Sequence, residues 1–396
     1  MAINAVRAKD INRSHVLNII RKRSRLSRQE IAESIGLSAP AVGYLVSELI
    51  EQGLVIEQGR RAKMRGQPAI ELELRPNGAH TIGLHLKRDE IIGIVVNLIG
   101  EIKSKRIISL DKVPLPEETL KIFTEIIDEL YIPKKHNNFL GVGLVSFGPL
   151  DLEKGSINAP HISSHWVDVA LRDLLAGSSN LTVYLDNDAT AAAIGEHWYG
   201  IGQDYQNYLS IDIGEGLGGG LFLNGQAYRG STLNAGEFGH MLVNDDGELK
   251  FLEDIIGLKA FALKLGSKYS KNAATNIEQA FEKKDKELLR YVDSMAKVLA
   301  QAIVSVDNLL DLDAIILGGQ LSRGFLQYLL DKTRKYSEPI FMRGKPKRAK
   351  LLIGKMGKFS AALGAATLPI YDRFVIPATL SSKVNVFHSE EVLAND

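Results

Sequence analysis

The sequence predicts an α/β protein in two parts, a small basic unit of helices at the N-terminus and a larger body of two α/β lobes. Three observations predict this organisation. Apolar residues before residue 53 recur at helical spacing, and a short alternating stretch follows them. From about residue 79, apolar strands alternate with longer helical stretches, one of them near residues 255–310. The 396 residues, 45% hydrophobic and 24% charged, form a globular composition too long for one small domain.

Composition argues against several classes of protein. No apolar run approaches the roughly 20 residues needed to span a bilayer, and the start MAINAVRAKDINRSHVL lacks the apolar core of a secretory signal. We therefore expect a cytoplasmic protein with no membrane partner. Because the chain has no cysteine, it can form neither a disulfide nor a thiolate metal site.

The stretch SRQEIAESIGLSAPAVGYLVSELIEQGLV predicts two helices joined by a tight turn. Ser27 and Glu30 have the spacing of a capping box, and Gly36 stands where a helix needs a left-handed residue to end. Ser38 is suited to cap the next helix, with Pro40 in its first turn, where a missing N–H costs nothing. The arrangement is that of a helix-turn-helix, whose second helix lies in the major groove of DNA.

A nucleic-acid surface is predicted on this unit, because its cations outnumber its acids before residue 70. The residues expected to face base edges are Ser38, Ala39, Pro40, Ala41, Gly43 and Tyr44. The following segment LVIEQGRRAKMRGQPAIELEL alternates into two strands around a basic tip, typical of a wing. The wing residues expected to contact DNA are Arg60, Arg61, Lys63 and Arg65. A helical protein–protein module is the alternative, and DNA is favoured because the capped turn and the basic tip agree independently.

The body carries glycine turns at the ends of apolar strands, as in GVGLVSFGPL, YLSIDIGEGLGGGLFLNG and AIILGGQLSRG. Sheets of this type place ligands at the carboxyl ends of their strands. These turns, together with LDNDATAAAIGE, AGEFGH, the stretch SFGPLDLEKGSINAPHISSHWVDVALRDLL and the winged segment, resemble transcriptional regulators of the ROK family (repressor, open reading frame, kinase). The resemblance covers nearly the whole chain and is to the xylose- and N-acetylglucosamine-repressor-like members.

The resemblance implies a winged helix-turn-helix followed by a two-lobed, actin-like ATPase and sugar-kinase body of the ribonuclease H-like type. The implied boundaries are 1–75 for the DNA-binding domain and 79–190 for the first lobe, completed by 372–396. Residues 191–371 would form the second lobe, which would carry a dimerisation surface.

A sugar site is also implied by the resemblance. Asn187 and Asp188 match the family's pair at a strand end, where the carboxylate accepts a sugar hydroxyl and, in kinases, serves as the base. An amide beside a carboxylate suits vicinal hydroxyls. The other implied sugar contacts are Glu237, His240, Glu253 and His161, the last standing where the family often has Asn.

Two departures from the family pattern bear on cofactors. The cysteine knuckle that normally joins His240 in binding zinc is missing from GHMLVNDDGELKFLEDIIG, so we expect no zinc. In ROK kinases, an Asp and a Gly-Gly-Thr turn handle the magnesium nucleotide in the hairpin at residues 82–102, and a Gly-Thr-Gly turn follows later. The residues at these positions here are His85, Lys87, Arg88, Asp89 and Glu215. They supply neither a phosphate cradle nor magnesium ligands, so we expect no ATP.

These observations favour a sugar-responsive DNA-binding regulator, a repressor before an activator, with no catalytic residues and no cofactor. Its expected partners are operator DNA, in an inverted repeat, and a small carbohydrate effector, bound by a homodimer or homotetramer. Two alternatives stay open: an ATP-dependent sugar kinase with an attached DNA-binding domain, and a regulator whose body docks another protein. The sequence does not identify the sugar, the operator or the sign of the response.

Overall fold

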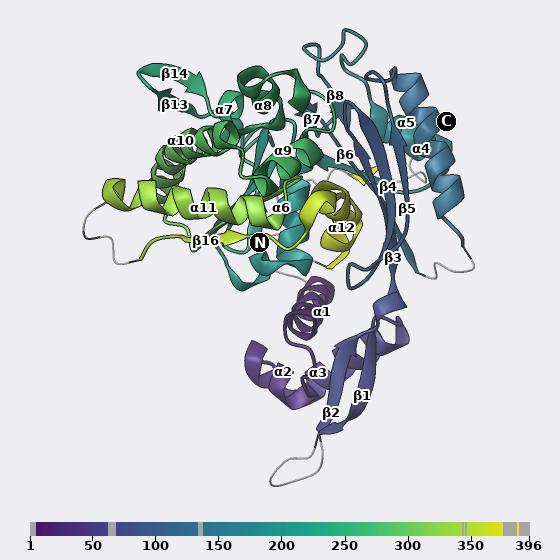
Figure 1. Cartoon of the computed structure of the whole chain (residues 1–396). Coiled ribbons are helices and arrows are strands. Elements are labelled where there is room, and N and C mark those ends of the chain that lie inside the picture. The colour runs from purple at the N-terminus through teal and green to yellow at the C-terminus, as the bar shows by residue number, and fades with distance from the viewer. Residues whose placement is uncertain are drawn as a thin grey trace.

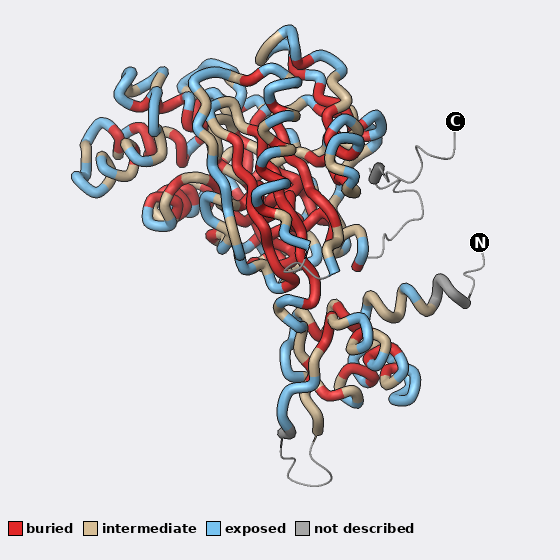
Figure 2. Tube along the Cα trace, turned by 90° about the vertical axis from the view of Figure 1, so that its right-hand side faces the viewer, coloured by how far each residue is buried: buried red, intermediate tan, exposed pale blue. Residues whose placement is uncertain are grey.

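The structure is a computed structural model that describes residues 5–61, 69–133, 138–342, 344, 347–374 and 386–387 (Figure 1). A small N-terminal unit lies below a larger body, and each has a buried core (Figure 2). Among the described residues, no helix is both long enough and apolar enough to cross a membrane.

The N-terminal unit contains the predicted helix-turn-helix and strand pair. Its elements are α1 (Ala5–Lys22), α2 (Arg28–Ile35), α3 (Ala39–Glu51), β1 (Val55–Arg61) and β2 (Ala69–Leu74). The Ser27–Glu30 capping box is confirmed, because each residue's side chain accepts a hydrogen bond from the other's backbone N–H. Gly36 ends α2 with a φ of 67°, and Ser38 Oγ accepts from Ala41 N at 3.4 Å. β1 and β2 pair antiparallel, as predicted.

The first lobe is built on a six-stranded sheet in the order β17-β9-β6-β3-β4-β5. Its strands are β3 (His80–Leu86), β4 (Glu90–Asn97), β5 (Ile102–Ser109), β6 (Phe139–Ser146), β9 (Val183–Asn187) and β17 (Val386–Phe387). β3, β6 and β9 run parallel, whereas the β3–β4 and β4–β5 pairs are antiparallel. The tail strand β17 pairs antiparallel with β9 at the edge of the sheet.

Side chains of β4 point alternately to the two faces of the first sheet, and both faces are buried at this strand. On one face, Ile91 and Val95 pack in the cluster of α4 (Pro116–Leu130) and α5 (Leu171–Ser179). On the other face, Ile92 and Ile94 pack against α12 (Ser360–Phe374). A small hairpin of β7 (Leu150–Asp151) and β8 (Ser156–Ile157) follows β6, and the 3-10 helix η1 (Pro76–Gly78) precedes β3.

The second lobe is built on a five-stranded sheet in the order β12-β11-β10-β15-β16. Its strands are β10 (Tyr208–Ile213), β11 (Leu217–Leu223), β12 (Gln226–Tyr228), β15 (Ala314–Gly319) and β16 (Lys350–Ile353). Its helices are α6 (Asp188–Tyr199), α7 (Glu253–Ile256), α8 (Leu258–Leu265), α9 (Ala273–Glu282), α10 (Lys286–Leu310) and α11 (Arg323–Ser337). The hairpin of β13 (Leu242–Asp245) and β14 (Glu248–Phe251) projects from it (Figure 1). The short 3-10 helices are η2 (Ile201–Asp204), η3 (Phe238–His240), η4 (Ser267–Tyr269), η5 (Glu338–Ile340) and η6 (Gly357–Phe359).

The predicted helical region near residues 255–310 is confirmed and consists of several helices, because Gly266 and Asn272 adopt positive φ and interrupt it before α10. One expected lobe boundary differs from the structure. Residues 360–371, which were expected in the second lobe, belong to α12, which packs on β3, β4 and β6 of the first sheet. Small residues at the contact allow that approach, since a Cβ added at Gly143 of β6 would lie only 1.7 Å from Ala365 O of α12. α12 also packs along α6, so these two helices form the seam between the lobes.

Candidate functional site

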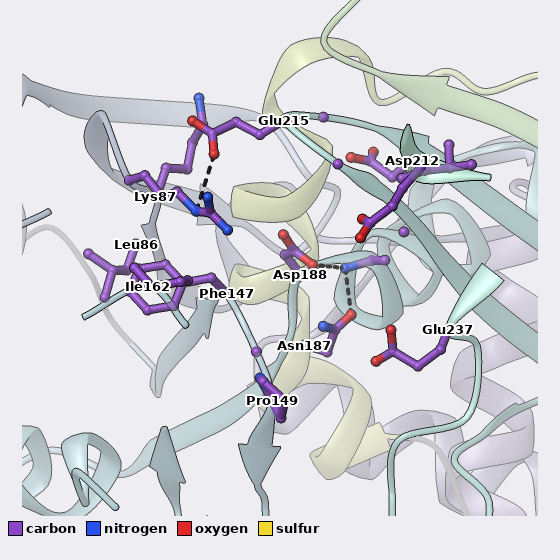
Figure 3. Close-up of a pocket in the computed structure, with 18 of the residues that line it drawn as sticks. Leu86, Lys87, Phe147, Pro149, Ile162, Asn187, Asp188, Asp212, Glu215 and Glu237 are labelled. Carbon is purple, nitrogen blue, oxygen red and sulfur yellow. Dashed lines mark hydrogen bonds and ion pairs between the residues drawn. The ribbon is translucent and has the colours of Figure 1, made fainter. Parts of the chain in front are cut away.

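The carboxyl ends of strands from both sheets surround one cavity of about 680 Å³ (Figure 3). Its lining includes Leu86 at the end of β3, Phe147 after β6, Asn187 at the end of β9, Asp212 near the end of β10 and Gln320 after β15. A topology that brings strand ends together in this way creates a ligand site without contributions from the middle of either sheet.

All six residues that sequence analysis assigned to a sugar site line this cavity. They are Asn187, Asp188, Glu237, His240, Glu253 and His161. They come from segments far apart in the chain, and the fold brings them to one place. Their role in binding stays a prediction.

Asn187 and Asp188 stand at the start of α6. Asn187 Oδ1 caps the helix by accepting from Ala189 N at 3.0 Å and Thr190 N at 3.3 Å. The amide NH₂ is therefore the group that Asn187 can offer to a ligand. Asp188 Oδ1 accepts from Ala189 N at 2.7 Å. Burial raises the pKa of Asp188 to about 7, and the charges of Asp212 and Glu237 act in the same direction. A carboxyl with that pKa can accept from or donate to a hydroxyl near neutral pH.

His240 is held between two carboxylates. Its Nδ1 lies 3.0 Å from Glu237 Oε2, and its Nε2 lies 3.6 Å from Glu253 Oε1. The β13–β14 hairpin runs from His240 to Glu253, and the edge-on ring of Phe251 packs on the imidazole at 5.6 Å between centroids. The hairpin thus fixes the position of two cleft residues. Within the described ranges, no group of three or more histidine and acidic side chains is placed to hold a metal ion.

The other end of the cavity holds the residues that sequence analysis placed at the positions of the kinase phosphate turns. Arg88 Nε, in the β3–β4 turn, lies 3.4 Å from Glu215 Oε2 in the β10–β11 turn, so an ion pair joins the two lobes across the cleft. Lys87 pairs with Glu90 and lies 3.7 Å from Asp89. Figure 3 shows Lys87 and Glu215 together, away from Asn187 and Glu237.

His85 adds no charge at this end of the cavity. Burial lowers its pKa to about 3, so its imidazole is neutral at physiological pH. The cations that line this end of the cavity are therefore Lys87 and Arg88, and both already have carboxylate partners.

Sequence analysis missed several lining residues. Asp212 is the most informative of them, because it is a carboxyl held inside the cleft by a hydrogen bond from Ser360 Oγ at 2.7 Å. Burial raises its pKa. Its signal in the sequence is an acid between Ile211 and Ile213 near the end of an apolar strand. Other residues that were not assigned individually are Phe147, Gly148, Pro149, Ile162, Asn234 and Gln320. Their signal was the glycine turns of GVGLVSFGPL and AIILGGQLSRG, which contain four of them; Ile162 and Asn234 lie outside those turns.

The predicted base-reading residues lie on one outer surface of α3. Ser38, Ala39, Pro40 and Ala41 are exposed, and Gly43 is half-buried. Tyr44 is 59% exposed, and its hydroxyl accepts from Lys9 Nζ at 3.2 Å. The opposite face of the helix, with Val42, Leu45, Val46 and Leu49, is buried. Arg60 and Arg61 end strand β1, whereas Lys63 and Arg65 lie outside the described residues.

Comparison with known proteins assigns the chain to a family. The model of the ROK family matches residues 81–371, which is most of the chain. The chain belongs to the ROK family. A second model, winged helix-turn-helix DNA-binding, matches residues 9–56 ahead of the ROK body.

Relatives of the chain include a regulator and a kinase. The xylose repressor of Caldicellulosiruptor bescii is 26% identical over 393 residues, covering 93% of this chain and 98% of the relative. A ROK family transcriptional regulator, a homolog of the E. coli MLC protein, has a TM-score of 0.70 at 22% identity, covers 93% of this chain and 98% of its own, and shows the fold. A ROK family glucokinase from Streptomyces griseus, in complex with glucose and AMPPNP, has a TM-score of 0.63 at 25% identity. That match covers 73% of this chain and 99% of the kinase chain.

Proposed function

We propose that this ROK protein is a sugar-responsive transcriptional regulator, a repressor whose binding to operator DNA changes when a carbohydrate occupies the cleft. One observation carries the proposal: the cleft has side chains suited to bind hydroxyls at one end, while an Arg88–Glu215 ion pair lies at the end that the family resemblance assigns to phosphates in kinases. The attached helix-turn-helix supplies the DNA-binding half. The name of the xylose repressor relative agrees with this reading.

The sugar end suits a polyhydroxylated ligand. Asn187 offers amide donors, Asp188 and Glu237 offer carboxylate acceptors, and His240 offers a ring nitrogen whose orientation its acidic neighbours hold. Adjacent donors and acceptors of this kind match the neighbouring hydroxyls of a hexose or pentose ring. The site binds the ligand and leaves it chemically unchanged.

The phosphate end argues against a sugar kinase. To bind a nucleoside triphosphate, a site needs free backbone N–H groups, a magnesium ion and unpaired cations. Glu215 places a carboxylate in that region, and the two cations that line it, Lys87 and Arg88, are already paired with carboxylates. A phosphate group entering here would break these pairs and meet Glu215 and Asp212. The effector class is therefore an unphosphorylated carbohydrate.

A thermal-shift screen tests the ligand. D-Xylose, D-glucose, N-acetyl-D-glucosamine, their phosphorylated forms and magnesium ATP are added separately to the full chain. We expect one free sugar to raise the melting temperature, since a ligand at a hundred times its Kd stabilises a fold by about 2.7 kcal/mol. We expect no shift with magnesium ATP. If magnesium ATP raises the melting temperature and the protein then transfers phosphate to a sugar, the protein is a sugar kinase and the proposal is wrong.

The Glu215→Gln variant tests the discrimination against phosphate. It keeps the shape of the side chain and removes the charge that repels phosphate. We expect the wild type to bind the phosphorylated sugar at least about tenfold more weakly than the free sugar, a difference of ~1.4 kcal/mol that the variant reduces. Equal binding of the two ligands by the wild type would contradict the assigned effector class.

DNA binding is tested by selecting binding sequences from a random duplex library with the full chain. We expect an inverted repeat with half-sites about one or two helical turns apart, bound by a homodimer or a homotetramer. A selection that enriches no sequence would refute the DNA-binding half of the proposal.

A further inference from the structure

The N-terminal unit is packed on the ROK body through α1. Val16, Leu17 and Ile20 of α1 belong to one buried apolar cluster with Trp198 of α6 and Phe374 of α12. Figure 1 shows α1 directly below α12, between the body and the other two helices of the unit. Because the two cores are continuous, the orientation of the DNA-binding unit depends on the positions of the C-terminal ends of α6 and α12.

Two polar side chains of α1 reach the two body helices separately. Asn18 Nδ2 donates to Phe374 O, the last residue of α12, at 3.1 Å. Arg21 Nη1 donates to His197 O at 3.1 Å and Trp198 O at 2.5 Å, in the last turn of α6. Its guanidinium also lies 4.3 Å from the centre of the Trp198 ring. A cation at these carbonyls is favoured by the helix dipole. Spaced three residues apart, the two side chains face the same way and are joined by Arg21 Nε donating to Asn18 Oδ1 at 3.3 Å.

The two body helices follow different lobes. α12 packs on β3, β4 and β6 of the first sheet. α6 is seated on β11 of the second sheet, where Gly218 and Gly220 let Ala189 and Ala193 approach so closely that an added Cβ would lie 2.5 and 2.4 Å from their methyl carbons. A helix seated that tightly moves with its sheet. α6 also touches α12 closely at one point, where an added Cβ at Gly364 would lie 2.1 Å from Ala191 O, and that contact serves as the pivot between the two helices. A change in the angle between the lobes therefore displaces the end of α6 relative to the end of α12.

α6 also begins in the cleft. Its first residue is Asp188, capped by Asn187, and Trp198 follows ten residues later, about 15 Å along the axis. A single buried helix thus has one end among the predicted sugar contacts and the other under Arg21. Ligands that hold both lobes act on the position of this helix.

We propose that Asn18 and Arg21 form the contact through which the cleft controls the DNA-binding unit: α1 spans the ends of α6 and α12, and a sugar that changes the angle between the lobes reorients α1 and the reading helix α3. This inference rests on the proposed function. The contact is suited to being remade, because some of its buried polar atoms have no hydrogen-bond partner within the described residues. These atoms are Arg21 Nη2, His197 Nδ1 and Trp198 Nε1. A joint with unpaired buried polar atoms can gain hydrogen bonds when it is rearranged, which lowers the free energy that a bound ligand must supply to move it.

The first experiment measures coupling. Operator Kd is determined by fluorescence anisotropy with and without the sugar found in the screen, for wild type, Arg21→Met, Asn18→Ala and the control Arg13→Met. Methionine keeps the aliphatic stem of Arg21 and removes its donors. Arg13 lies on the same helix and pairs with Asp10 on the surface at 2.8 Å. We expect a sugar-dependent change in wild-type Kd of about 5–150-fold. The change should persist in Arg13→Met and fall towards one in the other two variants, which still bind the sugar.

The outcomes separate the two proposals. Arg21→Met and Asn18→Ala variants that bind sugar and keep the wild-type change in Kd would overturn this inference and leave the proposed function intact. A wild type that binds operator DNA but shows no sugar effect would overturn both.

The second experiment observes the contact directly through tryptophan fluorescence. The chain has two tryptophans, so Trp166→Phe leaves Trp198 as the one emitter. We expect sugar to change the Trp198 emission in that variant and not after Arg21→Met is added. Trp166 is fully buried, so its replacement disturbs packing and a second route to the signal is useful. The difference in emission between wild type and Trp198→Phe gives the Trp198 signal with Trp166 in place. Saturating sugar that leaves the Trp198 signal unchanged in both would overturn the inference.

Discussion

Neutralising Asp188 is expected to stabilise the ligand-free protein and to weaken its binding of sugar. The folded chain raises the pKa of this carboxyl from its ordinary 3.8 to about 7, first through burial and then through Asp212 and Glu237. Each pH unit of such a difference corresponds to about 1.4 kcal/mol, so ionising Asp188 costs the fold up to ~4 kcal/mol. Because the side chain is half-buried, solvent screening reduces this cost, and we expect Asp188→Asn to stabilise the protein by about 2 kcal/mol at pH 8.

The pH dependence has a defined sign. The wild-type carboxyl is protonated in both folded and unfolded chains below about pH 4, so the variant and wild type should then be equally stable. As pH rises from about 4 to about 7, the unfolded chain loses this proton first, and the wild type loses stability relative to the variant. Above about pH 7 the difference should be constant. Melting temperatures of the two proteins at pH 4, 6 and 8 measure it.

Asp186 supplies a matched control two residues earlier. It is 2% exposed and forms two contacts with Arg229, Oδ1–Nη1 at 2.7 Å and Oδ2–Nη2 at 2.6 Å. Asp186→Asn leaves that guanidinium without its counter-charge, so it should destabilise the protein by about 3 kcal/mol. Asp188→Asn should also weaken sugar binding by about 10–150-fold, the loss of a charge-assisted hydrogen bond of ~1.5–3 kcal/mol. A less stable Asp188→Asn at pH 8, or unchanged sugar affinity, would refute the reasoning.

Two further predictions concern the fold. Gly143→Ala should lower the melting temperature, because the added Cβ would lie 1.7 Å from Ala365 O of α12 and should reduce the free energy of unfolding by about 3 kcal/mol or more, the upper end of the range for an overpacked core. Gly177→Ala, at an exposed position of α5 with nothing within 4 Å of the added Cβ, should instead stabilise the protein by about 0.5–1 kcal/mol, and equal effects of the two substitutions would contradict the packing argument. Ser27→Ala should destabilise the N-terminal unit by about 1 kcal/mol in urea unfolding, since it removes the cap of α2. Ser47→Ala in α3, where the hydroxyl donates to a backbone carbonyl in mid-helix, should cost nothing, and a loss as large as that of Ser27→Ala would show that capping is not the cause.

Local features of the N-terminal unit were predictable from the sequence. The capping box at Ser27 and Glu30, the left-handed Gly36 and the cap at Ser38 depend on residues at most three positions apart, and the structure confirms each of them. The pattern of buried residues in α3 follows from helical periodicity in the same way. Such features are short-range, so neighbouring residues decide them without reference to the rest of the fold.

The candidate site was predictable in part. Asn187, Asp188, Glu237 and His240 stood out because polar residues and glycines follow apolar strands in a family pattern, and the cavity contains them all. Asp212 was missed, although an acid near the end of a buried strand was its signal.

By itself, the sequence determined the capped helices, the alternating strands and the family, because each shows in short stretches of neighbouring residues. Only the tertiary structure decided that Arg88 meets Glu215 across the cleft, and that Arg21 meets the end of the helix that starts at Asp188. The physical reason is distance along the chain. Residues 127 and 177 positions apart are brought together by the packing of whole sheets and helices, and no local propensity specifies which of them will touch.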